Sequence, residues 1–232
     1  MLVVPPELNR NSITVTSLMP PEESGRWLLE RMARQLGIGD FARTSILDFG
    51  CGVRFTQALL NLGLPIGRYA GVDCHRPLID FLAANVRDER FSFHAFDVFH
   101  PLYNPAGETL AAASDLSLPS GPFDIACMFS VVTHLYPEDA EAVFALLRRR
   151  VGATGRLFFT CFLDESLAAF ADRSEERNGG RCFYRSEFLA GLLGRAGWAV
   201  VERFSAEAPL IGDSFVCRPV EARPSRPQGR TP

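Results

Sequence analysis

The sequence contains no lysine, so all 24 of its basic residues are arginine. The glycine-rich phosphate loop of nucleotide-cleaving enzymes needs a lysine that reaches the phosphates. Kinases and enzymes that form a Schiff base also depend on a lysine side chain. Neither ATP cleavage nor pyridoxal chemistry is therefore expected of this chain.

Three further features are missing. No stretch approaches the roughly 20 apolar residues that a membrane span needs, and the opening MLVVPPELNR lacks the charged start of a signal peptide. The six cysteines include no CxxC pair, which indicates structural thiols rather than a zinc site or a disulfide framework. The 24 basic and 27 acidic residues include no sustained basic run, which argues against a nucleic-acid or membrane surface. We expect a cytoplasmic protein with a small-molecule substrate; the sequence does not indicate an oligomeric state.

The length and composition fit a single domain. With 232 residues and 47% hydrophobic content, the chain can bury one sizeable core, and no break in composition divides it. We expect an irregular segment over residues 1–19, one domain over 20–219, and a disordered tail rich in proline and arginine over 220–232.

Apolar periodicity alternates between strand and helix along this domain. A first helix begins at the pair Pro20 and Pro21 and ends at Gly37. The predicted strands cover residues 45–49, 68–73, 91–96, 123–132, 155–163, 198–204 and 213–219. The later predicted helices cover residues 54–63, 76–86, 137–150 and 186–197. Two polar segments, 100–122 and 164–181, are expected to leave the scaffold as excursions.

This order of elements predicts a doubly wound, Rossmann-like α/β fold with a seven-stranded sheet and helices on both faces. The link between the last two strands, 205–212, is too short for a helical crossover, so these strands should form an antiparallel hairpin. Ligands of such sheets bind beyond the carboxyl ends of the strands, near the switch in strand order.

Acids and glycines follow the ends of the first three predicted strands. Gly50 and Gly52 permit a tight turn and a close approach of a ligand to the backbone, and Asp48 beside them favours an ammonium or hydroxyl donor over a phosphate. Asp73 is placed to accept hydrogen bonds from a ribose diol, and Asp97 can accept from an amine such as that of adenine. A ligand with an amino-acid end, a ribose and an adenine fits all three acids.

These residues also have purely structural interpretations. The glycines can serve a turn alone, Asp73 can cap the helix that begins near Pro77, and Asp97 can simply close a strand. The dinucleotide fingerprint GxGxxG is incomplete, because its third glycine would stand at Phe55.

The motifs resemble those of class I S-adenosylmethionine-dependent methyltransferases. The resemblance covers roughly residues 46–219 and rests on LDFGCG, GVD, FDV, PFDIACMFSVVTHL and the C-terminal hairpin. It implies S-adenosylmethionine as the cofactor. The implied cofactor contacts are Asp48, Gly50, Cys51, Gly52, Asp73, Cys74, Asp97, Val98 and Ser130. The family usually has a third glycine where this chain has Arg54, so either the loop is one residue shorter or the arginine side chain leaves the pocket.

His134 lies just beyond the fourth predicted strand, where substrate meets cofactor in the fold that the resemblance implies. The implied reaction is an in-line displacement of a methyl group, and an oxygen nucleophile gains from an imidazole base. His134 is therefore a candidate base, or else it caps the next helix or packs under the cofactor. Tyr136, Asp164 and Tyr184 are further candidates for contact with the substrate. The histidines show no metal-ligand spacing.

The similarity of SVVTHL to small-molecule methyltransferases implies that the acceptor is a small metabolite or a saccharide, methylated on oxygen. The Asn/Asp-Pro-Pro-aromatic motif of amino-group DNA methyltransferases is absent after the fourth strand. Two other functions stay open at this point. Arg54 suggests a module that holds the cofactor without turnover, and a nicotinamide oxidoreductase shares the strand, the glycines and the distant acid.

Overall fold

A computed structural model of the chain describes residues 1–9, 19–99, 104–108, 110, 122–173, 181–207 and 212–220. The strands are β1 (Phe41–Phe49), β2 (Ile66–Asp73), β3 (Phe91–Ala95), β4 (Phe123–Met128), β5 (Val151–Leu163), β6 (Phe170–Asp172), β7 (Cys182–Tyr184), β8 (Trp198–Phe204) and β9 (Asp213–Pro219). The helices are η1 (Pro6–Leu8), α2 (Pro21–Leu36), α3 (Arg54–Asn61), α4 (Arg76–Asn85), η2 (Val132–His134), α5 (Pro137–Arg148) and α6 (Ser186–Arg195).

The strands form one sheet in the order β3-β2-β1-β4-β5, with β9 and then β8 continuing beside β5. Strands β1 to β5 pair in parallel, whereas β9 pairs antiparallel with both β5 and β8. The doubly wound fold and the closing antiparallel hairpin are therefore confirmed. The order reverses between β1 and β4, which makes the carboxyl ends of these two strands the switch point of the sheet.

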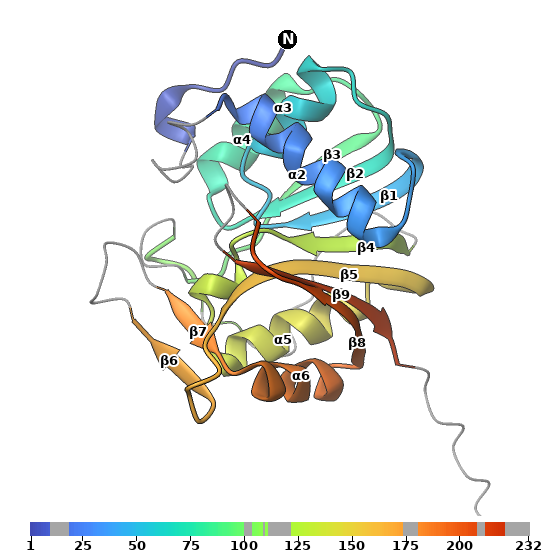
Figure 1. Ribbon diagram of the computed structural model, residues 1–232. Helices are drawn as coiled ribbons and strands as arrows, with labels where there is room; N and C mark the ends of the chain where they lie inside the picture. The colour runs from blue at the N-terminus through green and yellow to red at the C-terminus, as the bar shows by residue number, and fades with distance from the viewer. Residues whose placement is uncertain are drawn as a thin grey trace, which may run out of the picture.

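Helices cover both faces of the sheet (Figure 1): α2, α3 and α4 lie on one face, and α5 and α6 lie on the other. Strand alternation divides the core in the same way. In β4, for example, Ala126 and Met128 join the cluster beneath α5 and α6, whereas Ile125 and Cys127 join the cluster beneath α2 and α3. The central strands are buried on both faces, which explains their nearly continuous apolar sequence.

Several segments differ from the sequence prediction. β1 begins at Phe41 rather than at residue 45, and β5 begins at Val151 rather than at residue 155. The fourth strand ends at Met128 rather than at residue 132, because Ser130 adopts a left-handed backbone with φ 57° and the chain then forms η2. The excursion over 164–181 contains β6, and β7 follows it, so that a short antiparallel ribbon extends the sheet beyond β5. Most of the excursion over 100–122 and the predicted tail over 221–232 lie outside the described residues.

The first residues of the chain pack against the helices of the domain. Leu2 and Val4 are buried with Leu78, Leu82 and Val53, the residue that precedes α3. The backbone of Leu2 also exchanges two hydrogen bonds with the side chain of Asn61, at the end of α3.

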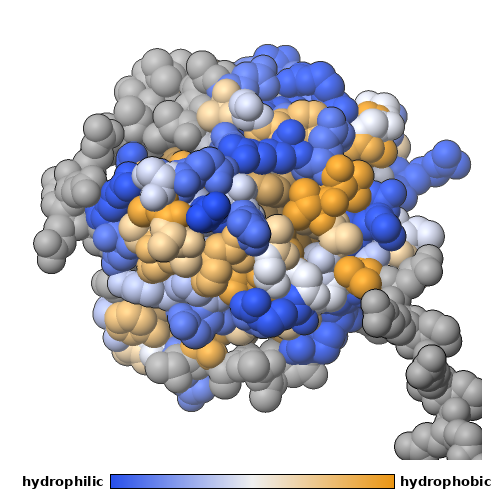
Figure 2. Space-filling model, turned by 60° about the horizontal axis from the view of Figure 1, so that its bottom comes forward, coloured by the Kyte–Doolittle hydropathy of each residue, from blue (hydrophilic) through white to orange (hydrophobic). Residues whose placement is uncertain are grey.

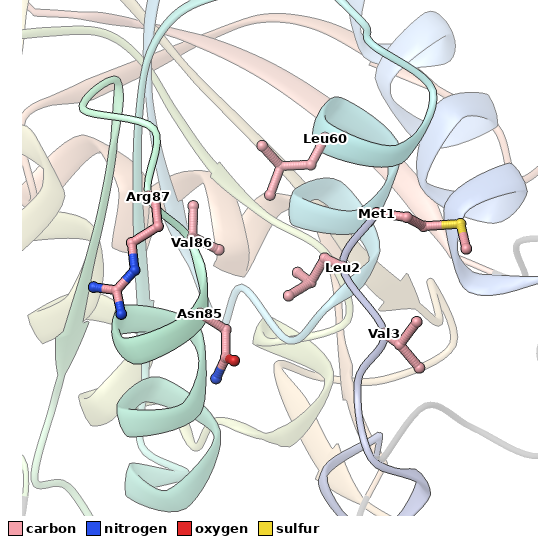
Figure 3. A pocket seen from close by; sticks show the side chains of 7 residues that line it. All are labelled: Met1, Leu2, Val3, Leu60, Asn85, Val86 and Arg87. Atoms are coloured by element: carbon pink, nitrogen blue, oxygen red, sulfur yellow. The ribbon is translucent and has the colours of Figure 1, made fainter.

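A pocket of about 480 Å³ lies between this N-terminal segment, α3 and α4 (Figure 3). Its lining includes Leu60, Asn85 and Val86, at the carboxyl ends of the two helices. In an alternating α/β fold, these helix ends lie at the edge of the sheet opposite the switch point. The pocket is therefore separate from the residues that the sequence singles out.

No helix in the described part of the chain is long and apolar enough to cross a membrane. On the face turned to the viewer in Figure 2, hydrophilic side chains break the apolar residues into separate patches.

Candidate active site

The loop after β1 forms the floor of the site. The amides of Gly50 and Cys51 both donate to the carbonyl of Val72, at 2.7 and 3.0 Å, which ties the loop to the end of β2. Gly50 (φ 77°) and Gly52 (φ 48°) both have left-handed backbones, which glycine adopts without strain. The turn that the sequence predicts is therefore present.

The two glycines face different surroundings. A Cβ atom on Gly50 would lie 2.4 Å from Cγ2 of Val131, in the loop after β4, so the two loops touch at this point. A Cβ atom on Gly52 would meet no atom of the described structure within 4 Å. The backbone at Gly52 is thus the part of the loop that a ligand can approach.

Asp73 lies at the end of β2 and connects the loop to α4. Its Oδ2 accepts a hydrogen bond from the amide of Gly52 at 3.0 Å, and its Oδ1 accepts one from the amide of His75 at 2.9 Å. A carboxylate offers about four lone-pair positions, so these two hydrogen bonds leave acceptor capacity for a ligand. The N-cap residue of α4 is His75, and no side chain caps this helix, so the structure does not support the cap interpretation of Asp73. The ligand interpretation stays a prediction.

Asp48 is placed differently from the other acids. It is 3% exposed, and its carboxylate accepts hydrogen bonds from Tyr69 Oη at 2.7 Å and from Cys127 Sγ at 3.5 Å, on the two neighbouring strands. Burial raises the pKa of Asp48 to about 7, although both hydrogen bonds oppose that rise. We expected this carboxylate to contact a ligand beside the glycines, but it is enclosed below them, because the side chain turns into the sheet.

Asp97 and Val98 follow β3. Asp97 is exposed, and Oδ1 of its carboxylate accepts a hydrogen bond from Nδ2 of Asn104 at 2.9 Å. The half-buried Val98 forms an isolated bridge with Glu108. Asp97 therefore keeps an accessible oxygen at the same edge of the sheet as Asp73.

The two cysteines near the loop are poor nucleophiles. Cys51 is buried and fills the space beside Gly71, where a Cβ atom would lie 2.9 Å from its Sγ. Burial raises the pKa of Cys51 well above its usual range, and it raises the pKa of Cys74 to about 12. Both thiols are protonated at neutral pH, which agrees with a passive role.

The loop after β4 forms the opposite wall. Ser130 donates its backbone N–H to Oγ1 of the buried Thr160 at 2.9 Å, and this bond holds its left-handed conformation. Left-handed non-glycine residues concentrate at functional sites. His134 is the last residue of η2, where its amide donates to the carbonyl of Val131, and its side chain is exposed.

An aromatic wall continues from this loop and is formed by Tyr136, Phe170 and Tyr184. The ring of Phe170 lies 5.5 Å from that of Tyr136 and 5.2 Å from that of Tyr184, between ring centroids. Tyr136 is 50% exposed, and its hydroxyl donates to Asp172 at 2.5 Å. Tyr136 lies between η2 and α5, whereas Phe170 and Tyr184 belong to β6 and β7, the short ribbon that sequence reasoning did not find.

Two of the weaker substrate candidates have structural partners. Tyr184 is fully buried, and its hydroxyl donates to the carbonyl of Leu135 at 2.6 Å. Asp164 accepts hydrogen bonds from Ser166 and Arg173, and these bonds lower the pKa of its carboxyl. The burial of Tyr184 argues against direct contact with a substrate, whereas for Asp164 this contact stays a prediction.

Sequence reasoning also missed the partners of Asp48. Tyr69 stands in a nearly apolar parallel strand, where a buried hydroxyl needs a hydrogen-bond partner, and that was an available signal. Cys127 gave no signal, because a buried thiol in a strand is ordinarily a small apolar side chain. Among the described residues, no group of three or more His, Cys, Asp or Glu side chains is arranged to hold a metal ion.

Comparison with known proteins gives a consistent picture. A family model described as a methyltransferase domain matches residues 22–203. A Burkholderia thailandensis 1,6-didemethyltoxoflavin-N1-methyltransferase, solved with 1,6-didemethyltoxoflavin and S-adenosylhomocysteine, has a TM-score of 0.58 and 20% identity, covering 89% of this chain and 81% of that one. The glycopeptide N-methyltransferase MtfA, solved with S-adenosylmethionine, has a TM-score of 0.59 and 13% identity, covering 85% and 93%. The CcbJ methyltransferase of Streptomyces caelestis has a TM-score of 0.55 and 15% identity, covering 87% and 90%.

Proposed function

The chain belongs to the methyltransferase-domain family, and from this premise we propose that it methylates an oxygen atom of a small molecule or a saccharide. It is an S-adenosylmethionine-dependent methyltransferase, so the nicotinamide alternative is withdrawn. When bound, S-adenosylmethionine supplies a methyl group on a positively charged sulfur, from which a nucleophile displaces it in line.

The residues at the switch point fit this cofactor. Gly52 leaves open space over its backbone, Asp73 has spare acceptor positions, and Asp97 is exposed at the next strand end. We assign the ribose hydroxyls to Asp73 and the adenine amine to Asp97, because carboxylates accept hydrogen bonds from both groups. Gly50, Cys51, Cys74, Val98 and Ser130 would shape the walls of this site. Asp48 would act from below by holding β1 against its neighbours.

The observation that carries the acceptor proposal is the contact between the two loops. Because Val131 lies against Gly50, the η2 turn is held beside the cofactor loop, and the exposed His134 belongs to that turn. Positioning of the two reactants is the main contribution that an enzyme can make to a methyl transfer. We infer that the acceptor lies between His134 and the aromatic wall.

His134 is the proposed general base. A hydroxyl is a weak nucleophile until its proton leaves, and an imidazole that titrates near neutral pH can take that proton. The half-exposed ring of Tyr136 offers an apolar surface to a sugar ring or an aromatic ring, and the carboxylate of Asp172 beside it can accept hydrogen bonds from hydroxyl groups. A small polyhydroxylated or phenolic acceptor suits this combination.

The acceptor atom is tested by turnover with methyl-labelled S-adenosylmethionine. Pairs of acceptors that differ only in a hydroxyl or an amino group are supplied, and the product is analysed by mass spectrometry and NMR. Oxygen methylation of the hydroxyl members is expected. Two of the similar structures are of N-methyltransferases, and methylation confined to the amino members would contradict the proposal, as would a methylated macromolecule as the sole product.

The role of His134 is tested by His134→Ala and His134→Gln on the acceptor so identified. Loss of a general base lowers kcat by about 100-fold or more, and it also removes the fall in rate at acidic pH that imidazole protonation causes. Affinity for the cofactor, measured by calorimetry, should stay unchanged. Wild-type turnover in His134→Ala would exclude His134 as the base.

A cytoplasmic location is also proposed. All six cysteines are free, which suits a reducing compartment. Fractionation of cells that produce the untagged chain tests this.

A further inference from the structure

Arg54 is a half-buried cation for which the described residues provide no partner. It is the first residue of α3, directly after the cofactor loop. Its Nε atom is buried without a hydrogen bond, and no described acid forms an ion pair with its guanidinium. Burial lowers the pKa of Arg54, and no neighbouring carboxylate offsets this effect.

The buried Arg31 differs from Arg54 in having charged and polar partners, although its Nε and Nη1 atoms also lack hydrogen bonds. Its guanidinium donates to Ser214 at 3.2 Å and lies 3.5 Å from the carboxylate of Glu207. Burial lowers its pKa too, but Glu207 and Asp213 act in the opposite direction. Arg54 has no such compensation among the described residues.

The position of Arg54 makes the isolated charge less favourable still. The first turn of a helix carries partial positive charge, so a cation there is destabilising unless an anion is near. Val53, which precedes the helix, makes no side-chain cap bond. An unpaired, partly desolvated cation at this position is costly for the free protein, which suggests that it has a partner in the liganded state.

Packing fixes the point from which the Arg54 side chain starts. A Cβ atom on Gly25 of α2 would lie only 2.2 Å from the carbonyl oxygen of Arg54, so the two helices are in close backbone contact. Two residues before Arg54, Gly52 is held by Asp73 and leaves open space above it. The Arg54 side chain therefore starts at the same end of the cofactor loop as the open space.

We propose that Arg54 binds the carboxylate of the methionine portion of the cofactor and thereby selects ligands that carry this group. The inference rests on the methyl-transfer function given above. A guanidinium can form two parallel hydrogen bonds with a carboxylate, which gives orientation as well as affinity. Asp73 and Asp97 would accept hydrogen bonds from the adenosine end of the cofactor, whereas Arg54 would donate hydrogen bonds to the methionine end. The cofactor would therefore bind in one orientation only.

The test compares two ligands that differ in the carboxylate alone, S-adenosylmethionine and decarboxylated S-adenosylmethionine. Calorimetry on the wild type should give a preference of about 10- to 100-fold for the carboxylated ligand, the range for a charge-assisted hydrogen bond. In Arg54→Gln this preference should fall below about threefold, with the affinity for the decarboxylated ligand unchanged. Arg54→Lys should give an intermediate preference, because it keeps the charge and loses the paired geometry.

The matched control is Arg43→Gln, which removes the same charge from an exposed position near the start of β1, at the opposite edge of the sheet. It should keep the wild-type preference. Urea unfolding of the ligand-free protein gives a second readout. Because Arg54 has no partner among the described residues, Arg54→Gln should be at least as stable as the wild type without ligand.

The outcomes separate this inference from the function on which it rests. Two outcomes would overturn the role of Arg54 and leave the methyl-transfer function standing. In the first, Arg54→Gln keeps the wild-type preference for the carboxylated ligand. In the second, it loses affinity equally for both ligands and is also less stable. Failure of the wild type to bind either ligand would overturn both.

Discussion

The buried carboxyl group of Asp48 should make the stability of this protein fall as the pH rises. Burial raises its pKa from 3.8 to about 7, so between these two values the folded chain holds a proton that the unfolded chain releases. Stability from this group is therefore complete below about pH 4 and is lost as the pH approaches 7. Each pH unit corresponds to about 1.4 kcal/mol, so the full loss over this window is about 4 kcal/mol.

Asp48→Asn imitates the protonated carboxyl and removes this titration. The free energy of unfolding of this variant should therefore increase relative to that of the wild type as the pH rises. Urea denaturation followed by circular dichroism at pH 4.5, 5.5, 6.5 and 7.5 measures this difference. The difference between the two proteins isolates the contribution of Asp48, because the other titrating groups are common to both. A constant offset between the two proteins is expected from the substitution itself and does not affect the slope.

Two companion variants sharpen this test. Tyr69→Phe removes a hydrogen bond that lowers the pKa of Asp48, so the loss of stability should continue to higher pH in this variant. Asp80→Asn makes the same chemical change at an exposed position on α4 and shows what the substitution alone contributes. Parallel curves for the wild type and Asp48→Asn from pH 4.5 to 7.5 would refute the reasoning, because a carboxyl group with an ordinary pKa is ionised throughout most of this range.

The remaining predictions concern the loops and the wall. Gly52→Ala should lose about 1 kcal/mol of stability, because alanine is strained in a left-handed backbone, and it should lose most of its affinity for S-adenosylmethionine, because the new methyl group enters the open space. Gly63→Ala is the control: with φ 64° and equally open surroundings, it should show only the loss of stability. Calorimetry and urea unfolding check both variants, and equal affinities would contradict the assignment of that space. Tyr184→Phe should cost about 1–2 kcal/mol because the carbonyl of Leu135 loses its donor, whereas the exposed Tyr136→Phe should stay within about 0.5 kcal/mol. The same denaturation experiment measures both, and a reversed order would contradict the roles that we give to the two tyrosines.

The scaffold could be predicted because its signals are local. Glycines in the turn after β1, the prolines at the start of α2 and α5, and the apolar runs of the central strands each act within a few residues of themselves. The antiparallel pairing of β8 and β9 also followed from a local property, the length of the link between them.

What could not be predicted depends on contacts between distant parts of the chain. β6 and β7 have three residues each and form a ribbon only because they pair with each other and with β5. Asp48 is buried because Tyr69 and Cys127, on separate strands, provide its hydrogen bonds. A strand-end acid that faces a ligand and one that turns into the sheet have the same sequence signature, and only the neighbouring strands distinguish them.

The contact between Gly50 and Val131 has a thermodynamic consequence. The two loops that meet there come from strands on either side of the switch point, and neither can move freely past the other. A ligand that shifts one loop therefore also changes the free energy of occupying the other. Because such coupling is reciprocal, the factor by which the donor changes affinity for the acceptor must equal the factor by which the acceptor changes affinity for the donor.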